Sequence, residues 1–157
     1  MTAAVYLAGI CLLAGCGAGA GWLLARRSRE QWRQAHAFGR LLEYLQAAVR
    51  YRTLTGGEVL DKAAAYPEFA RLGLEHCPRF GMLRPPDAFD PALRQELSAD
   101  LEALEGAPRD SACAMLARML ALCRRQETEL RKAADAAARL YPRLGGCIGA
   151  MAAILLL

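Results

Sequence analysis

The chain begins with a long uncharged run, and this run restricts the fold more than any other feature of the sequence. It extends over 23 residues, from Ala3 to Ala25, and a group of arginines follows it. As a helix rising about 1.5 Å per residue it would be roughly 34 Å long, enough to cross a hydrocarbon core of about 30 Å. We therefore expect residues 1–25 to form a transmembrane helix.

The arginines beside this run predict how the helix is oriented. No Lys or Arg precedes the run, and four arginines follow it closely. Because positive charge collects on the cytoplasmic side of a membrane helix, we expect the chain after residue 25 to be cytoplasmic. A second pair of arginines precedes the apolar C-terminal end. Together they form a predicted basic collar at the membrane interface, made of Arg26, Arg27, Arg29, Arg33, Arg139 and Arg143.

Two alternatives for the first run are a lipoprotein signal and a cleaved secretory signal. The stretch Leu13-Ala14-Gly15-Cys16 resembles a bacterial lipoprotein cleavage box. Both kinds of signal carry positive charge before their apolar region, whereas the charges here come after it. The nine residues that follow Cys16 are uncharged as well. The membrane span is therefore the favoured interpretation.

Every charged residue lies between Arg26 and Arg143, a stretch of 118 residues that has the size of one ordinary domain. We expect residues 26–143 to form a cytoplasmic helical domain that is followed by an apolar membrane segment in residues 144–157. The formal net charge of +4 is modest, and the collar accounts for it. Nucleic-acid binding, which needs a dense basic face, is therefore not expected.

Helical periodicity dominates the domain. After Arg33, apolar residues recur every three or four positions as far as Tyr51, so the span and this stretch are predicted to form one long helix. Thr55 and Glu58 fit a capping box for a short helix through Ala65. Two more helices are expected before residue 106. The predicted apolar stripes are Trp32, Ala35, Phe38, Leu41, Leu42, Leu45, Ala48 and Val49; Val59, Leu60, Ala63 and Ala64; and Leu93, Leu97, Leu101 and Leu104. Phe69, Leu72 and His76 mark a brief helix between the last two of these stripes.

Prolines and glycines divide the helices from one another. Four of the seven prolines lie in residues 78–91, which predicts a long loop there. Asp90 is expected to cap the helix after this loop, and that helix ends at the break Gly106-Ala107-Pro108. Asp110 or Ser111 is expected to cap a last helix of about 30 residues before Pro142.

The C-terminal run from Leu144 to Leu157 leaves three arrangements open. As a helix its 14 residues would be about 21 Å long, which is shorter than the hydrocarbon core. The alternatives are a partial insertion, a span that starts earlier while Arg143 reaches back to the interface, and a buried core helix. Because arginines flank both runs, we expect a second membrane segment. The predicted fold class is all-α: a membrane-rooted antiparallel helical bundle of about four to six helices.

Residues that could carry chemistry are few. His36 has no acidic residue three or four positions away, and His76 ends a predicted helix, so both are interpreted as surface or boundary histidines. The six cysteines contain no C-x-x-C pair, which disfavours a metal or disulfide framework. We therefore expect no enzymatic activity, no metal and no cofactor. Four acidic residues opposite a leucine stripe are interpreted as a solvated helix face: Glu96, Asp100, Glu102 and Glu105.

Glycines recur inside both apolar runs. No Lys-Ser/Thr pair follows them, so they do not form a phosphate-binding loop. Small residues four positions apart allow membrane helices to approach closely, and we expect the two spans to pack on each other or on a partner through them. The glycines concerned are Gly15, Gly17, Gly19 and Gly21 in the first run, and Gly145 and Gly149 in the second.

The end of the chain carries a pattern that points to a family. The stretch Leu140-Tyr141-Pro142-Arg143-Leu144-Gly145-Gly146, with apolar residues after it, resembles the ending of the stage III sporulation protein AB family. Tyr51-Arg52-Thr53-Leu54 and Glu58-Val59-Leu60 occupy places comparable to a turn and a helix start in that family, whose Thr-Pro is missing here. Gly106 and Asp110 fall near its Gly and Asp before the final helix. The motif positions are Tyr51, Thr53, Glu58, Gly106, Asp110, Tyr141, Leu144 and Gly145.

This resemblance implies a non-enzymatic structural role. The cytoplasmic domain would be similar to the helical domain of the type II secretion platform protein. The chain would then be a membrane platform subunit of a secretion-like channel between mother cell and forespore, located in the plasma membrane, in the mother-cell membrane that faces the forespore. Its partners would be other sporulation channel subunits, including a secretion-type cytoplasmic ATPase, and self-association stays open. The alternative is a generic membrane-anchored helical adaptor that is unrelated to sporulation.

Overall fold

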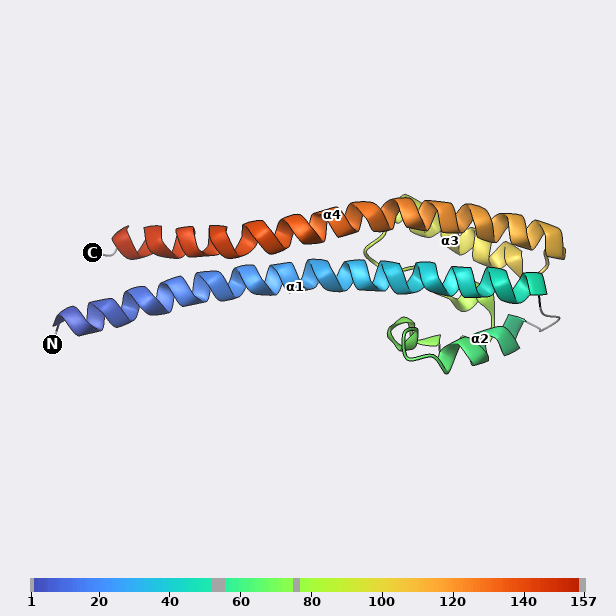
Figure 1. The fold of residues 1–157 in the computed structure, drawn as a ribbon, viewed down its shortest axis with the longest axis horizontal. Helices are drawn as coiled ribbons and strands as arrows, with labels where there is room; N and C mark the ends of the chain where they lie inside the picture. Colours follow the sequence, from blue (N-terminus) through green and yellow to red (C-terminus); the bar gives the residue numbers. More distant parts are fainter. Residues whose placement is uncertain (1, 52–55, 75–76, 156–157) are drawn as a thin grey trace. The chain divides into compact units, whose positions relative to one another are not determined.

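The computed structural model describes residues 2–51, 56–74 and 77–155, and Figure 1 shows their path. Within these residues the chain forms four α-helices and no β-strand. The all-α prediction is therefore confirmed at this level. The elements are α1 (Thr2–Tyr51), α2 (Gly56–Ala64), the 3₁₀ helices η1 (Ala70–Leu72) and η3 (Phe80–Met82), α3 (Pro91–Leu104) and α4 (Arg109–Leu155).

The two longest helices each contribute to two compact units. Unit 1 consists of Met1–Glu30 and Leu130–Leu157, and unit 2 consists of Gln31–Glu129. Inside each unit, a segment of α1 and a segment of α4 run side by side in opposite directions (Figure 1). The prediction that one helix continues from the first apolar run to Tyr51 is confirmed by α1.

Unit 2 has a core of large apolar side chains. The three- and four-residue spacing places Phe38, Leu41 and Leu45 on one face of α1, and all three are almost completely buried. The matching stripe on α4 contains Leu116 and Met119. Fully burying one such side chain stabilises a fold by about 1.5–3 kcal/mol. Further fully buried members of this core are Leu42, Val59, Leu60, Phe69, Leu97, Leu101 and Cys123.

The chain between α2 and α3 is less helical than its sequence predicts. The brief helix expected around Phe69 and Leu72 is replaced by turns and by η1, which Gly73 ends in a left-handed conformation at φ 63°. Only glycine adopts this conformation at little cost. The predicted loop in residues 78–91 is largely irregular, as expected, and it packs Phe89 edge-to-face on Phe38. Thr55 and His76 lie outside the described residues.

The helix starts of α3 and α4 differ from the sequence prediction in detail. Asp90 occupies the N-cap position of α3, but its side chain makes no capping hydrogen bond. α4 begins at Arg109, so Asp110 and Ser111 lie in its first turn, and the prediction that one of them caps this helix is wrong. The backbone carbonyl of Pro108 instead accepts a hydrogen bond from Ala112.

α4 does not end before Pro142. It continues through this proline to Leu155 and therefore joins the C-terminal apolar run to the last cytoplasmic helix that we predicted. In the described part of the chain, no helical stretch meets the length and hydropathy that a membrane crossing requires. Of the two apolar runs, most side chains of residues 1–18 and of residues 149–157 lie outside the described residues.

Candidate functional site

Small residues form the contact between the two helices of unit 1. Among the side chains of this unit that the structure describes, the buried positions on α1 are Gly21 and Ala25, and those on α4 are Ala134 and Ala137. A Cβ atom added at Gly21 would lie 2.8 Å from the carbonyl carbon of Tyr141 and closer still to its oxygen. The backbones of α1 and α4 therefore approach each other closely at this level.

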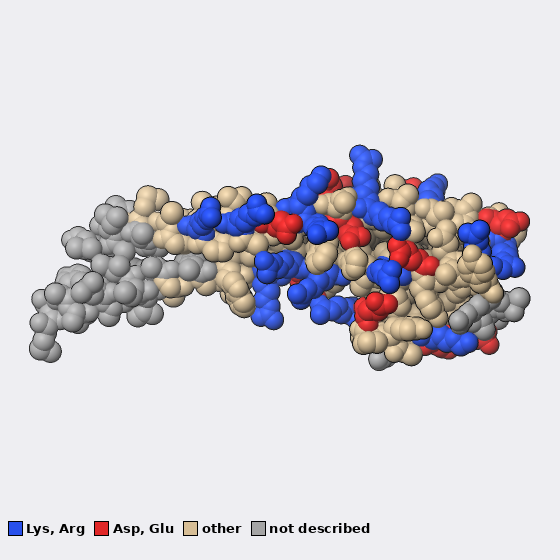
Figure 2. Space-filling view, viewed as in Figure 1, with Lys and Arg blue, Asp and Glu red and all other residues tan. Residues whose placement is uncertain are grey.

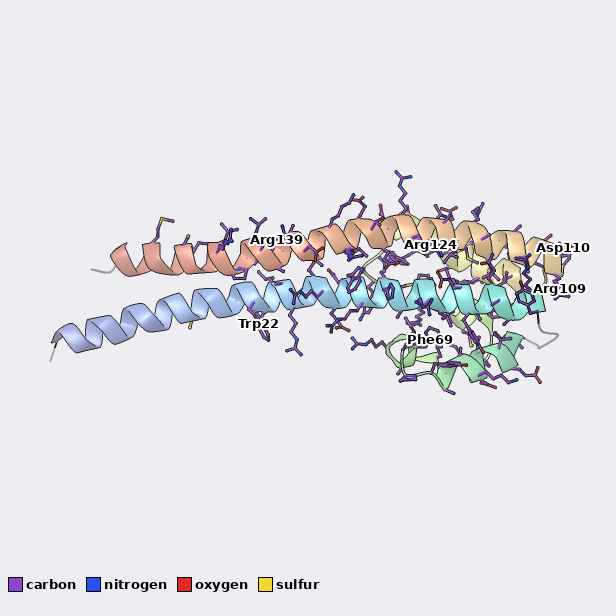
Figure 3. All side chains as sticks on the ribbon, in the orientation of Figure 1. Trp22, Phe69, Arg109, Asp110, Arg124 and Arg139 are labelled. Atoms are coloured by element: carbon purple, nitrogen blue, oxygen red, sulfur yellow. The ribbon has the colours of Figure 1, made fainter. Side chains whose placement is uncertain are left out.

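Most of the large apolar side chains that the structure describes in the same unit lie on its outside. Trp22 is 58% exposed and points away from α4 (Figure 3), and Ile148 on α4 is 62% exposed. Unit 2 has the opposite arrangement, because its largest apolar side chains are the buried ones. The other large apolar residues of unit 1 with about half or more of their surface exposed are Leu23, Leu24, Leu140, Leu144 and Met151.

This distribution is the one expected of helices that pack in lipid. In water, large apolar side chains drive folding by leaving the solvent. In a bilayer the surrounding tails are equally apolar, so helices associate through small residues that let their backbones approach. Extensive exposed apolar surface on a protein in water marks a place where something else covers it. Unit 1 is therefore the candidate functional site.

Arginines lie close in sequence to the exposed apolar residues on both helices of unit 1. In the described part of the chain, five members of the predicted collar are exposed and form no ion pair, whereas the sixth, Arg33, belongs to unit 2. The guanidinium of Arg26 lies 5.6 Å from the centre of the Trp22 ring, within cation–π range. The five exposed arginines without an ion pair are Arg26, Arg27, Arg29, Arg139 and Arg143.

The charge of the protein is divided unequally between the units. Unit 1 contains seven basic and two acidic residues, a net charge of +5, and unit 2 contains 13 basic and 14 acidic residues, a net charge of −1. Figure 2 shows basic and acidic atoms mixed over unit 2, whereas the described part of unit 1 on the same face carries mostly basic ones. The positive excess of the whole chain therefore belongs to unit 1.

The predicted glycines divide into three groups. Gly21 is buried against α4, and Gly145 is half-buried. Gly15 and Gly19 are exposed, and a Cβ atom at either would meet nothing within 4 Å among the described residues, so no close approach to the described part of α4 occurs at this pair. The surroundings of Gly17 and Gly149 lie outside the described residues, and packing against a partner stays a prediction for all of them.

The polar contacts of unit 2 join α1 to α4. The side chain of Arg109 donates hydrogen bonds to the carbonyl oxygens of Val49, at 3.0 Å, and of Arg50. These carbonyls belong to the last turn of α1 and have no intrahelical donor, and a cation beside them also opposes the negative end of the helix dipole. Figure 3 labels Arg109 in the first turn of α4. The sequence analysis did not identify this contact.

A second group of contacts centres on Glu127 and Glu43. Nδ1 of His36 lies 2.7 Å from a carboxylate oxygen of Glu127, so this histidine has an acidic partner on α4 that its own helix does not provide. Arg124 donates a hydrogen bond to Glu43 at 2.7 Å, and Arg40 donates a second one at 2.9 Å. The hydrogen bond from Arg124, followed by that from Arg40, holds the pKa of Glu43 below 4.5 despite partial desolvation.

The acidic face of α3 is more than a solvated surface. Asp100 accepts two hydrogen bonds from Arg118 on α4, at 2.7 and 2.9 Å, and Glu96 lies 3.4 Å from the same guanidinium. Glu105 accepts a hydrogen bond from the backbone N–H of Gly81. Glu96, Glu102 and Glu105 are exposed and Asp100 is half-buried, so the cluster lies on a solvated face as predicted. Three of its members also attach the α3 region to α4 and to η3, which the sequence did not predict.

The surface of unit 2 contains an open aromatic hollow of about 290 Å³. Its aromatic rings, on Tyr44, Tyr66 and Phe69, contact one another with centres 5.7–6.2 Å apart. Two of its charged side chains, those of Arg40 and Glu43, are already paired with each other. In the described part of the chain, no three metal-ligating side chains gather in one place. The residues lining the hollow are Arg40, Glu43, Tyr44, Tyr66, Glu68 and Phe69.

The positions that carry the family resemblance do not form one site. Tyr51 is exposed at the end of α1, Glu58 lies in the first turn of α2, and Gly106 lies in the turn after α3. Tyr141 and Leu144 are exposed on α4, within unit 1. Asp110 and Gly145 lie in α4, and Thr53 is outside the described residues.

Comparison of the chain with family models, with curated proteins and with solved structures finds no match.

Proposed function

We propose that this chain is a non-enzymatic scaffold subunit that is rooted in a membrane through the two apolar runs of unit 1. The observation that carries this proposal is the reversed packing of that unit, with Gly21, Ala25, Ala134 and Ala137 inside and large apolar side chains outside. Lipid tails would cover the outer side chains at no cost in solvation.

The other properties of the chain agree with this role. The uncharged run in residues 3–25 is long enough for a crossing. The unpaired arginines beside it match the charge that cytoplasmic flanks carry. The contacts of unit 2, such as that of Arg109 with the end of α1, hold helices together and leave an aromatic surface open. A rigid helical domain held at a membrane surface is suited to couple other proteins.

We propose more narrowly that the chain is a platform subunit of a sporulation-specific, secretion-like channel, with unit 2 in the mother-cell cytoplasm and a secretion-type ATPase among its partners. This narrower proposal rests on the resemblance of residues 140–146 and of the helix layout to the stage III sporulation protein AB family. The generic membrane-anchored adaptor has the same architecture. Purification of the tagged chain from sporulating cells distinguishes the two, because recovery of neither an ATPase nor a sporulation membrane protein would favour the adaptor.

Membrane attachment is tested by alkaline extraction of membranes from cells that express the full chain. The unaltered protein is expected to stay in the membrane pellet. Ile148→Arg places a charge on the outer surface of unit 1, where insertion costs about 2.5–3.5 kcal/mol, and it should shift protein to the supernatant. Met82→Arg is the matched control, because Met82 is similarly exposed but belongs to unit 2. Extraction of the unaltered chain by alkali would refute the membrane root.

The orientation is tested with a cysteine at Ala99, an exposed position on α3. A membrane-impermeant maleimide is expected to label Ala99→Cys only after the cells are permeabilised. Labelling of intact cells would place unit 2 outside and would contradict the proposed cytoplasmic location. The natural Cys113 is a poorer probe because it is half-buried.

A further inference from the structure

Two exposed aromatic residues lie at the same level of unit 1. The close approach of Gly21 to the backbone of Tyr141 fixes the register of α1 against α4. Trp22 is the next residue on α1, so its exposed ring and the exposed ring of Tyr141 belong to the same level on the two helices. Trp and Tyr concentrate where hydrocarbon meets the headgroups. This level therefore marks the membrane interface in the proposed arrangement.

The five unpaired arginines gather around this level. Those of α1 lie five to eight residues beyond Gly21, which is about 8–12 Å along the helix. Because α4 runs in the opposite direction, Arg139 lies about 3 Å to the same side, and Arg143 lies about 3 Å to the other. A headgroup layer is about 5–8 Å thick, and long arginine side chains reach across the difference. All five guanidinium groups can therefore reach one headgroup layer.

The chemistry of these groups favours a phosphate partner. In the described part of the chain none of the five has a carboxylate within ion-pair distance, although each is exposed. Six of the seven basic residues of unit 1 are arginines. A guanidinium binds a phosphate through two parallel hydrogen bonds, which the ammonium group of lysine does not do. Among the described residues no protein oxygen accepts a hydrogen bond from these guanidinium groups, and a negatively charged phosphate would accept strong, charge-assisted ones.

We propose that the collar of unit 1, formed by Arg26, Arg27, Arg29, Arg139 and Arg143, binds the headgroups of anionic phospholipids in preference to zwitterionic ones. This inference rests on the membrane root proposed above and names the lipid class that the root selects. Each basic residue near an anionic surface contributes about 1 kcal/mol, so an anionic lipid whose headgroup lies beside one of these arginines is favoured about fivefold over a zwitterionic lipid at the same place. Exposed arginines also occur on unit 2, but that unit has a net charge of −1 and so lacks the positive excess that would attract anionic lipids.

The test uses the fluorescence of Trp22, which contacts Arg26, as a probe of nearby lipid. The full chain with Trp32→Phe, which leaves Trp22 as its single tryptophan, is reconstituted into bilayers that mix a brominated with an unbrominated lipid. Trp32 donates no hydrogen bond within the described residues, so its replacement by Phe removes none. Bromine quenches only an adjacent indole, so the quenching reports which lipids lie next to Trp22. Brominated phosphatidylglycerol is compared with brominated phosphatidylcholine at equal mole fraction.

Phosphatidylglycerol is expected to quench Trp22 with a relative affinity of about five over phosphatidylcholine, and this ratio should fall toward one at high salt. The triple variant R26Q/R27Q/R29Q should lower the ratio in the same way. The matched control R79Q/R84Q/R125Q removes the same charge from exposed positions of unit 2 and should leave it unchanged.

Each contrary outcome refutes a different statement. Equal quenching by the two lipids would overturn the lipid preference and leave the membrane root standing. Absence of quenching by either lipid would refute the membrane root itself. Loss of the preference on adding millimolar glycerol phosphate would identify a site for free phosphate and would also overturn the proposal.

Discussion

Replacement of Gly21 by alanine should weaken the packing of unit 1, whereas the same replacement at Gly19 should not. The two positions are two residues apart on α1 and therefore face opposite directions, about 200° around the helix. Gly21 is buried against the backbone of Tyr141, and Gly19 faces open space. The pair thus compares one chemical change in two surroundings.

The size of the effect follows from the geometry. A Cβ atom at Gly21 would lie 2.8 Å from the carbonyl carbon of Tyr141, whereas non-bonded carbons pack best at about 3.5–4.0 Å. The neighbour is backbone and cannot rotate away, so the helices must separate by about 1 Å. Overpacking of this kind costs about 1–3 kcal/mol. Both variants gain about 1 kcal/mol of helix propensity, and this gain cancels in the comparison.

The assay is thermal unfolding of the full chain in detergent micelles or bilayers, followed by helical ellipticity. For a protein of this size, 1 kcal/mol shifts the midpoint by about 2–4 °C, so Gly21→Ala should melt about 2–12 °C below Gly19→Ala. Hydrogen exchange should locate the loss of protection in residues 130–146. Equal midpoints, or a more stable Gly21→Ala variant, would show that α1 and α4 do not approach at this level and would refute the reversed packing.

Three further predictions concern unit 2. Arg109→Gln should lower the denaturant midpoint by the equivalent of about 1 kcal/mol, because two carbonyls of α1 lose their donors, and Arg125→Gln, at an exposed position, should leave it unchanged. The hydrogen bond from Arg124 lowers the pKa of Glu43 in the folded protein. The free energy of unfolding that Glu43 contributes is therefore present above pH 4.5 and is lost as the pH falls through the lowered pKa. In acid denaturation, Glu43→Gln should lose less free energy of unfolding over this range than the wild type. Burial raises the pKa of Cys123 to about 12, so at pH 8 mass spectrometry should find this thiol unmodified by iodoacetamide until the protein is unfolded. Rapid labelling of Cys123 in the native protein would contradict this expectation. An acid-denaturation profile of Glu43→Gln identical to that of the wild type would contradict the previous one.

The helices could be predicted from the sequence because their signals are local. The stripe from Phe38 to Leu45 and the leucines of α3 repeat at helical spacing. Phe38, Leu41, Leu42 and Leu45 are buried as predicted, and so are Leu97, Leu101 and Leu104, whereas Leu93 is half-buried. The turns near Gly73 were missed because a few apolar residues in a short segment fit a helix and a series of turns equally well. Continuation of α4 through Pro142 was missed because proline usually marks a helix boundary.

The contacts between helices could not be predicted, because they depend on register. His36 and Glu127 are 91 residues apart, and Arg109 and Val49 are 60 residues apart. No pattern along one helix states which residue of another helix will face it. The same limit applies to the glycines: Gly19 and Gly21 are equivalent in the sequence, and only the level of α4 decides that Gly21 is the buried one.

One helix can serve two surroundings because its buried face changes composition along its length. In unit 2, α1 buries Phe38 and Leu41, and the removal of their apolar surface from water stabilises the folded unit. In the described part of unit 1 it buries Gly21 and Ala25, which remove little apolar surface from water. In an aqueous setting unit 1 would therefore have little to hold it, while its exposed Trp22 would favour association with other apolar surfaces. The bilayer reverses both effects, since it solvates the outer side chains and leaves backbone packing as the force that joins the helices. Stability of unit 1 should then depend on lipid or detergent, whereas that of unit 2 should not. Protease protection of the two units, compared in bilayers and after detergent removal, would contradict this division if both units lost protection together.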